Sequence, residues 1–222
     1  MKPNWMLPLL LLAGACTARQ TCWSDTEREI ITRSDSVMYV TTLWDRADSA
    51  ILRTPSVDLT PEELRSPLLQ TLADKMLVTV LSPEQDGVGL AAPQVGLNRR
   101  VIAVWREDKP GQPYELYANV HLDSLYGEIT HGPEGCLSVP PYRGYVPRYS
   151  SVVVSYIDIA TLEPRRDTVH GYSAIIFQHE CDHLDGRLYI DKADTVFYHA
   201  SWAEQRQAFD YSKPAWMTSL PE

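Results

Sequence analysis

The sequence predicts a single α+β domain in which one helix, a group of strands and a second helix follow one another along the chain. Apolar residues recur at helical spacing after Pro61 and again after Gly171, and the chain between them consists of short β-type runs separated by turns that contain Gly or Pro. Helices and strands segregated in this way are typical of α+β folds and differ from the alternation of parallel α/β folds. With 222 residues, 44% of them hydrophobic, the chain can bury one core and carry short extensions.

Residues 1–15 have the pattern of a signal peptide. Lys2 provides a positive charge, an apolar run begins at Trp5, and small residues stand directly before Cys16. The run is too short to span a bilayer, which takes about 20 apolar residues. Pro3, Pro8 and the small residues before Cys16 disfavour the alternative of a buried N-terminal helix. We therefore expect the chain to be exported.

Cys16 is a candidate for lipid attachment. It follows Ala-Gly-Ala and resembles the modified cysteine of bacterial lipoproteins, although Ala13 stands where that motif usually has Leu. Ala13-x-Ala15 also fits ordinary signal-peptidase cleavage. A membrane-anchored lipoprotein and a freely secreted protein are both open, and the only membrane contact expected is a lipid anchor on Cys16.

The next segments are an extension and a helix. Residues 16–47 are mainly polar and predict a tether or a loosely packed N-terminal extension. An amphipathic helix is expected to begin with Thr60 as its cap and Pro61 at its first position, and to run to about Leu81. Its apolar positions predict core packing, and they are Leu64, Leu68, Leu72 and Met76.

Three strands and a second helix complete the predicted domain. The β-type runs are Val101–Trp105, Glu115–Val120 and Val152–Ile159. Gly171–Leu184 is helical in pattern, with four residues on one face: Tyr172, Ile176, His179 and His183. The folded domain is expected to cover residues 48–195 and to be followed by a C-terminal tail, 196–222.

Charge and cysteine content exclude two classes of protein. The formal net charge is −9 and the chain has no Lys/Arg-rich run, which argues against a nucleic-acid partner. The four cysteines, at positions 16, 22, 136 and 181, do not have the spacing of a disulfide framework. At least one of them therefore needs a chemical explanation.

The sharpest local motif is His179-Glu180-Cys181-Asp182-His183. Histidines at i and i+4 of a helix present two imidazoles to one point, as a divalent metal requires, and the intervening Glu180 can reach a water at that point. The alternative is that these side chains only occupy a solvated helix face.

Two upstream segments add candidate residues. Gly87–Gln94 is glycine-rich without the context of a nucleotide-binding loop, and Gln94 offers a neutral amide donor. In Glu134–Pro140, Cys136 is a candidate third ligand that would complete a Cys-His-His set and leave a fourth tetrahedral position open. The alternatives are an ordinary turn for the first segment and a buried, inert cysteine for the second.

Together the three segments resemble the signature motifs of the peptide deformylase family, in the family's order. They match Gly-x-Gly-Leu-Ala-Ala-x-Gln, Glu-Gly-Cys-Leu-Ser and Gln-His-Glu-x-Asp-His-Leu-x-Gly, the last standing at Gln178–Gly186. Arg143 and Val146-Pro147-Arg148 also follow the cysteine motif as in many deformylases. The resemblance covers roughly residues 48–190.

The resemblance implies antiparallel β-sheets packed around a C-terminal metal-binding helix that carries His-Glu-x-x-His, with an N-terminal amphipathic helix. It also implies metal-dependent removal of the N-terminal formyl group of formyl-methionyl peptides, with release of formate. One divalent ion, Fe(II) or Zn(II), would be held by Cys136, His179 and His183. Glu180 would act as general base and then acid, while the amide of Gln94 and the backbone N–H of Leu137 would stabilise the oxyanion.

The family also suggests how a peptide would bind. Its partners would be N-formyl peptides, whose main chain would add as a strand beside the glycine-motif and cysteine-motif segments and contact Gly89. Val88, Ile175 and Ile176 stand at positions that look like the pocket for the first side chain. Glu134 and Arg143 are expected to pair near the site in a structural role.

Two other functions are weighed against this one. A zinc metalloprotease would use the same helix with a third ligand from downstream, and Asp191, Asp194 and His199 are the candidates. It would leave Cys136 and Gln94 without roles. A catalytically silent protein that captures formyl peptides is the other alternative. Export implies that the substrates are free formyl peptides or exported proteins, since the ribosome would be in another compartment.

Overall fold

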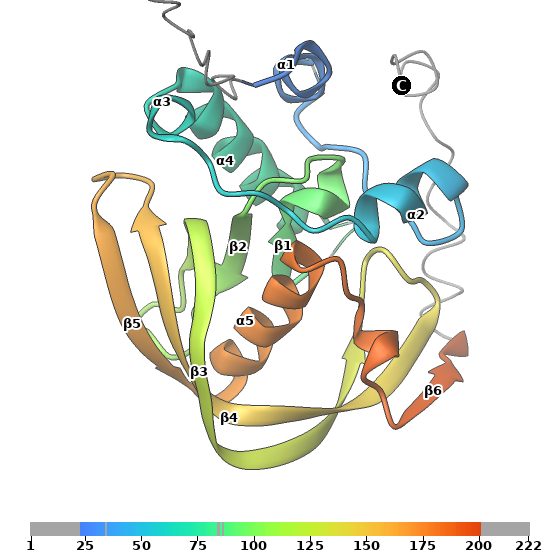
Figure 1. Cartoon of the computed structure of the whole chain (residues 1–222). Coiled ribbons are helices and arrows are strands. Elements are labelled where there is room, and N and C mark those ends of the chain that lie inside the picture. Colours follow the sequence, from blue (N-terminus) through green and yellow to red (C-terminus); the bar gives the residue numbers. More distant parts are fainter. Residues whose placement is uncertain (1–22, 34, 84, 86, 201–222) are drawn as a thin grey trace, which may run out of the picture.

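The computed structural model of the chain describes residues 23–33, 35–83, 85 and 87–200 (Figure 1). The predicted signal peptide, Cys16 and most of the predicted C-terminal tail lie outside the described residues. No helix in the described part of the chain is long and apolar enough to cross a membrane.

One antiparallel sheet forms the body of the described chain. Five strands pair in sequence order, and the sixth pairs with the first part of β4. The long strands β3 and β4 curve beneath helix α5 (Gly171–Leu184) in Figure 1. The strands are β1 (Gly89–Ala91), β2 (Val101–Trp105), β3 (Tyr114–Gly135), β4 (Tyr142–Asp158), β5 (Pro164–His170) and β6 (Thr195–Tyr198). The α+β class and the antiparallel sheet around a C-terminal helix are as predicted.

Strand β2 shows how the sheet separates two cores. Successive side chains of a strand point to opposite faces. On one face of the sheet, Val101 and Ala103 pack in the same cluster as residues of helix α4 (Pro67–Val80). On the other face, Ile102 and Val104 pack with residues of α5. All four are fully buried. The short apolar run that predicted this strand is therefore explained by burial on both faces.

The predicted helix from Pro61 to about Leu81 is two helices. The first, α3, covers Pro61–Leu64, and α4 begins at Pro67. Pro67 disfavours helical backbone at Ser66, whose φ and ψ are extended and whose hydroxyl accepts from the N–H of Leu68. The apolar spacing continued across this break, so periodicity alone could not detect it.

The N-terminal extension, predicted to be loosely packed, instead packs on the domain in its described part, from residue 23 onward. Helix α1 (Asp25–Thr32) begins with a capping box between Ser24 and Glu27. Ile31 is fully buried in the same core as α4. The next helix, α2 (Arg46–Leu52), follows an irregular stretch in which Met38 and residues 40–42 are buried. The polar composition misled because the buried residues of this segment are a minority and follow no regular spacing.

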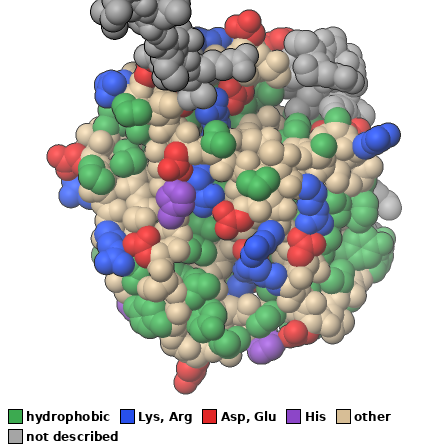
Figure 2. All heavy atoms as spheres, in the orientation of Figure 1, with side chains coloured by type: hydrophobic (Ala, Val, Ile, Leu, Met, Phe, Trp, Pro, Cys, Tyr) green, Lys and Arg blue, Asp and Glu red, His purple; other side chains and the backbone are tan. Residues whose placement is uncertain are grey.

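Three further differences concern length. β3 and β4 extend well beyond the predicted runs, because their outer parts pair with each other in a long hairpin instead of crossing the core. A short 3-10 helix, η2 (Tyr189–Asp191), follows α5. The predicted tail begins inside β6, which pairs with β4 at Tyr142–Tyr145. Acidic and basic side chains are interspersed over the face seen in Figure 2.

Candidate active site

Helix α5 holds two of the candidate ligands where the sequence predicted them. It begins at Gly171, whose φ of 64° is unfavourable for other residues, and it ends after Leu184. His179 and His183 lie one turn apart on the same face, with ring centroids 5.1 Å apart. The opposite side of the helix packs on the sheet through apolar residues such as Phe177.

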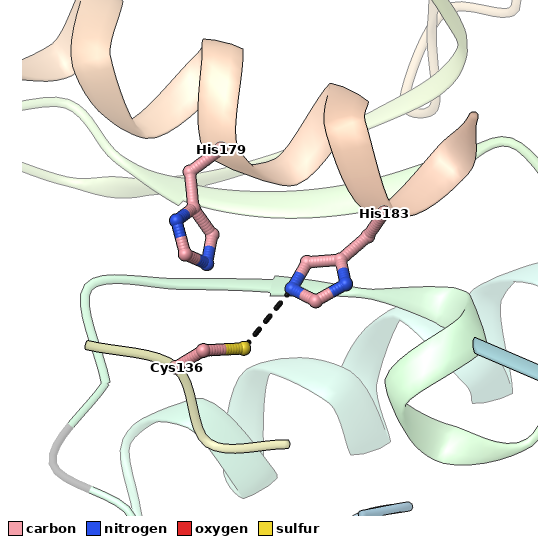
Figure 3. A group of neighbouring side chains, drawn as sticks. All are labelled: Cys136, His179 and His183. Atoms are coloured by element: carbon pink, nitrogen blue, oxygen red, sulfur yellow. Dashed lines mark hydrogen bonds between the residues drawn. The ribbon is translucent and has the colours of Figure 1, made fainter. Parts of the chain in front are cut away.

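Cys136 comes from the segment after β3 and meets these histidines. It lies directly after β3, and its Sγ is 3.2 Å from Nε2 of His183. One donor atom from each of Cys136, His179 and His183 lies within 4.8 Å of the other two. Figure 3 shows the thiol and both rings pointing toward a common centre. One thiolate and two imidazoles within this distance fit a divalent first-row metal such as zinc or iron.

Glu134 orients His179. Its Oε2 lies 2.7 Å from Nδ1 of His179, which leaves Nε2 for the common centre. Arg148 donates to both oxygens of Glu134, at 2.7 and 3.0 Å, and to Asp182 at 2.6 Å. The expected partner of Glu134 was Arg143; the hydrogen bonds place Arg148 there instead. Three elements, β3, β4 and α5, are thus tied together behind the candidate ligands.

The charges of this cluster follow from these contacts. Burial would raise the pKa of Glu134, but its hydrogen bonds to His179 and Arg148 lower it to about 2. Burial opposes protonation of His179, yet the neighbouring Cys136 and Glu134 raise its pKa well above the ordinary value. Burial lowers the pKa of His183 well below the ordinary value. Burial therefore favours the neutral form of His183, which is the form that binds a metal.

Glu180 lies beside the cluster without a hydrogen-bond partner for Oε2 among the described residues. Burial raises its pKa to about 7. Gly89 of β1 makes room for it, because a Cβ at position 89 would lie 2.3 Å from Oε1 of Glu180. A buried carboxyl group with a pKa near neutrality has the properties of a general acid or base.

Gln94 and Leu137 are the candidate donors for the oxyanion. The side-chain oxygen of Gln94 accepts from the N–H of Ala91 at 2.9 Å, which turns its NH₂ toward Cys136 and Ser138. That NH₂ donates to Ser138 Oγ at 3.2 Å and to Cys136 Sγ at 3.5 Å. Leu137 follows Cys136 directly and is 8% exposed. The hydrogen bond from Gln94 to Ser138 joins the glycine motif to the cysteine motif, and no feature of the sequence predicted it.

The residues predicted to form the side-chain pocket differ in how closely they approach Gly89. Ile176 is buried next to Gly89, where a Cβ would meet its Cγ2 at 2.8 Å. Val88 packs against the same core cluster, and Ile175 is half-buried one turn before His179. The structure therefore places Ile176 closest to Glu180 and Gly89.

The downstream residues of the metalloprotease alternative do not join the site within the described chain. The donor cluster contains only Cys136, His179 and His183. Asp191 forms an ion pair with Arg53. An oxygen of Asp194 lies 2.6 Å from Nδ1 of His131 on the outer hairpin. This arrangement disfavours a ligand set drawn from the residues after α5.

Comparison with known proteins identifies the family. Residues 44–197 match the family model described as polypeptide deformylase. The chain belongs to the peptide deformylase family. Peptide deformylases are hydrolases that remove the N-formyl group from peptides and use a single divalent metal.

Individual deformylases share both sequence and fold with the chain. Peptide deformylase 2 of Bordetella bronchiseptica is 41% identical over 134 residues, which cover 58% of this chain and 74% of that protein. The peptide deformylase of Leptospira biflexa is 37% identical over 149 residues, covering 64% and 82%. The class I type b enzyme of Acinetobacter baumannii with bound Met-Ala-Ser has a TM-score of 0.62 and 36% identity, covering 70% of this chain and 98% of that one. The Acinetobacter enzyme has also been solved with actinonin bound.

Proposed function

We propose that this deformylase acts on formyl-methionyl peptides and holds its metal through Cys136, His179 and His183. Family membership supports the reaction, and one observation supports the residues. Three soft and borderline donor atoms meet beside a buried carboxyl group, Glu180, that lacks a hydrogen-bond partner for one oxygen. A buried polar atom without a partner is costly, so its presence at this point favours a chemical role.

Glu180 is the proton carrier of the proposed reaction. When bound, a divalent ion would lower the pKa of a coordinated water and polarise the formyl carbonyl. Glu180 would take the proton of the attacking water and pass it to the nitrogen of the departing amine, so that the products are formate and a free N-terminus. A pKa of about 7 lets the same group accept and donate a proton near neutral pH.

Gln94 and Leu137 would stabilise the developing charge. As water adds, the formyl oxygen gains negative charge. The Gln94 NH₂, which donates to Cys136 Sγ at 3.5 Å, and the N–H of Leu137, the residue after Cys136, are the donors proposed for it. Loss of one such donor typically lowers the rate about 100- to 1,000-fold. The hydrogen bond from Ala91 holds the Gln94 amide in the orientation this role requires.

The peptide would bind beside β1. Its main chain would pair with the edge of β1 that β2 does not occupy, with Gly89 in contact. Its first side chain would lie against Val88, Ile175 and Ile176. The Met-Ala-Ser bound to the Acinetobacter relative supports methionine at the first position.

The location and the metal belong to the same proposal. The N-terminal pattern of residues 1–16 supports export, so that the substrates are free formyl peptides or exported proteins that still carry formyl groups. The thiolate–imidazole donor set accepts either Fe(II) or Zn(II). Outside the cytoplasm, Fe(II) and the Cys136 thiolate would both be exposed to oxidation, which favours zinc there.

Release of formate from a formyl-Met peptide tests the reaction. Residues 16–222 would be loaded with Fe(II) or Zn(II) under anaerobic conditions and compared with the Glu180→Ala variant. We expect kcat to fall at least about 100-fold in the variant, with metal content unchanged. A folded, metal-loaded wild type without activity would contradict the proposal and favour a formyl-peptide binding protein.

A further inference from the structure

A short segment before α2 joins the two loops that carry the proposed oxyanion donors. We call this segment, Tyr39–Leu43, the strap. The N–H of Thr41 donates to the carbonyl of Gln94 at 2.8 Å, and the N–H of Leu43 donates to the carbonyl of Ser138 at 2.8 Å. The hydroxyl of Thr41 adds a hydrogen bond to the carbonyl of Pro93 at 3.0 Å.

The two loops belong to distant parts of the chain. Gln94 lies in the 3-10 helix η1 (Ala92–Val95) after β1, and Ser138 follows β3. Their side chains meet directly in one hydrogen bond of 3.2 Å. The strap bonds to their backbone carbonyls and thereby fixes the separation of the loops by a second route. Within the described residues, it is the backbone connection that spans both loops.

Two side chains of the strap also pack in the apolar clusters that include residues of the site. Val40 is buried in the core cluster that includes Leu137, and Leu43 packs against the cluster that includes Cys136. The strap therefore packs in the same two apolar clusters as Leu137 and Cys136, while its backbone bonds to the two loops.

Asp48 of α2 holds the strap in place. Its Oδ2 accepts from the hydroxyl of Tyr39 at 2.7 Å and from the N–H of Thr42 at 3.0 Å. The side chain is fully buried. A buried carboxylate is costly unless it is hydrogen-bonded, and an apolar residue would fill the same volume without that cost. Two hydrogen bonds of this carboxylate go to the strap.

We propose that Asp48 is a positioning residue, which through the strap sets the distance between the Gln94 amide and the Leu137 N–H. The inference rests on the proposed function for the roles of these two donors. It adds a role for a helix and a segment that lie outside all three sequence motifs.

The consequence is a loss of rate with little loss of binding. Oxyanion donors act on charge that develops in the transition state, so their displacement lowers kcat and leaves KM almost unchanged. Displacement by a fraction of an ångström costs less than deletion of a donor, and misplacement by about 1 Å can cost about 100-fold. We expect Asp48→Ala to lower kcat about 10-fold, with KM within about 2-fold of wild type.

Three variants separate positioning from stability. Asp48→Asn keeps an oxygen that can accept both hydrogen bonds and should restore kcat to within about 3-fold of wild type. Glu63→Ala is the matched control, because Glu63 of α3 is also a buried carboxylate. It accepts a hydrogen bond from the N–H of Thr60 and forms an ion pair with Arg99. Glu63→Ala should lower thermal stability without lowering kcat. Tyr39→Phe removes only one of the hydrogen bonds to Asp48 and serves if Asp48→Ala does not fold; it should lower kcat about 3-fold.

A double-mutant cycle tests the route of the effect. In a Gln94→Ala background one of the two positioned donors is already absent, so Asp48→Ala should cost less there than in the wild type. Equal costs in both backgrounds would show that Asp48 does not act through Gln94. A kcat for Asp48→Ala equal to that of Glu63→Ala would overturn the proposal.

Amide hydrogen exchange provides a measurement that does not depend on activity. Asp48→Ala should speed exchange in segments 89–96 and 136–139, whereas Glu63→Ala should not. A wild-type protein that releases no formate would contradict the proposed function, and exchange alone would then decide whether the strap holds the two loops. Unchanged exchange in both segments would exclude the strap in either case.

Discussion

At the scale of single residues, Gly89 shows why the first motif needs glycine. Its φ is not in the left-handed region, so backbone freedom is not the reason. A Cβ would lie 2.3 Å from Oε1 of Glu180 and 2.8 Å from Cγ2 of Ile176. β1 cannot retreat easily, because Gly89 pairs with Val104 in the sheet. Any side chain would therefore displace Glu180.

We expect Gly89→Ala to lower kcat for formate release at least about 10-fold, because Glu180 would leave its catalytic position. Gly132→Ala is the matched control, since a Cβ at position 132 meets nothing within 4 Å. Steady-state assays of both variants check the prediction. Wild-type kcat in Gly89→Ala would mean that Glu180 does not act from the position described here.

The raised pKa of Glu180 predicts a pH dependence of stability in the metal-free protein. Its pKa rises from an ordinary value of 4.5 to about 7 in the folded chain, so the folded state binds the proton more tightly than the unfolded state. The tighter proton binding stabilises the folded state fully below about pH 4.5, and this stabilisation is lost as the pH rises to about 7. The difference corresponds to about 3 kcal/mol.

Glu180→Gln removes this titration. The metal-free variant should match the wild type in free energy of unfolding near pH 4.5 and exceed it by up to about 3 kcal/mol at pH 8. Urea unfolding at several pH values, with Glu128→Gln as an exposed carboxyl control, measures the difference. A constant difference in free energy of unfolding between the two proteins across this pH range would show that burial does not raise the pKa of Glu180.

At the scale of elements, the sequence predicted what periodicity and motifs encode. Strand β2 and helix α5 have the predicted bounds, because β2 is buried on both faces, α5 packs on the sheet, and both carry uninterrupted patterns. The donor cluster followed from the motifs. Periodicity missed the break before Pro67, since Leu64 and Leu68 keep helical spacing across it.

The contacts that complete the site could not be predicted from the sequence, because they join residues that lie far apart along the chain. Arg148 bridges Glu134 and Asp182 from three different elements. The strap bonds through backbone groups, which have no signature in side-chain identity. Neither spacing nor composition indicates which backbone carbonyl a buried N–H will meet.

Helix α1 provides the test for the N-terminal segment. If this segment were a loose tether, substitutions in it would not change stability. Ile31 is fully buried against the core of α4, so Ile31→Ala should lower the free energy of unfolding by about 2–5 kcal/mol. Ile129→Ala, at a site that is 51% exposed, is the control. Denaturant unfolding of the metal-loaded protein measures both, and equal values would place α1 outside the cooperative unit.

At the scale of the whole molecule, the packing of the N-terminal segment limits how far a lipid anchor could lie from the enzyme. The described domain begins at Trp23, which is buried. The chain from Cys16 to Trp23 can span at most about 25 Å when fully extended. A lipid on Cys16 would therefore hold the active domain against the membrane surface, where a 30-residue tether would have let it move freely.

This geometry makes the proposed location testable with one pair of cysteines. In a bacterial host, the full-length wild type should label with a fatty-acid analogue and sediment with membranes, because two acyl chains anchor a protein stably. Cys16→Ser should lose both label and membrane association, while Cys22→Ser, six residues away, should keep both. A cytosolic marker on the same immunoblots identifies leakage. Wild-type protein found only with that marker would contradict export, and unlabelled protein in the medium would replace the anchored form with a secreted one.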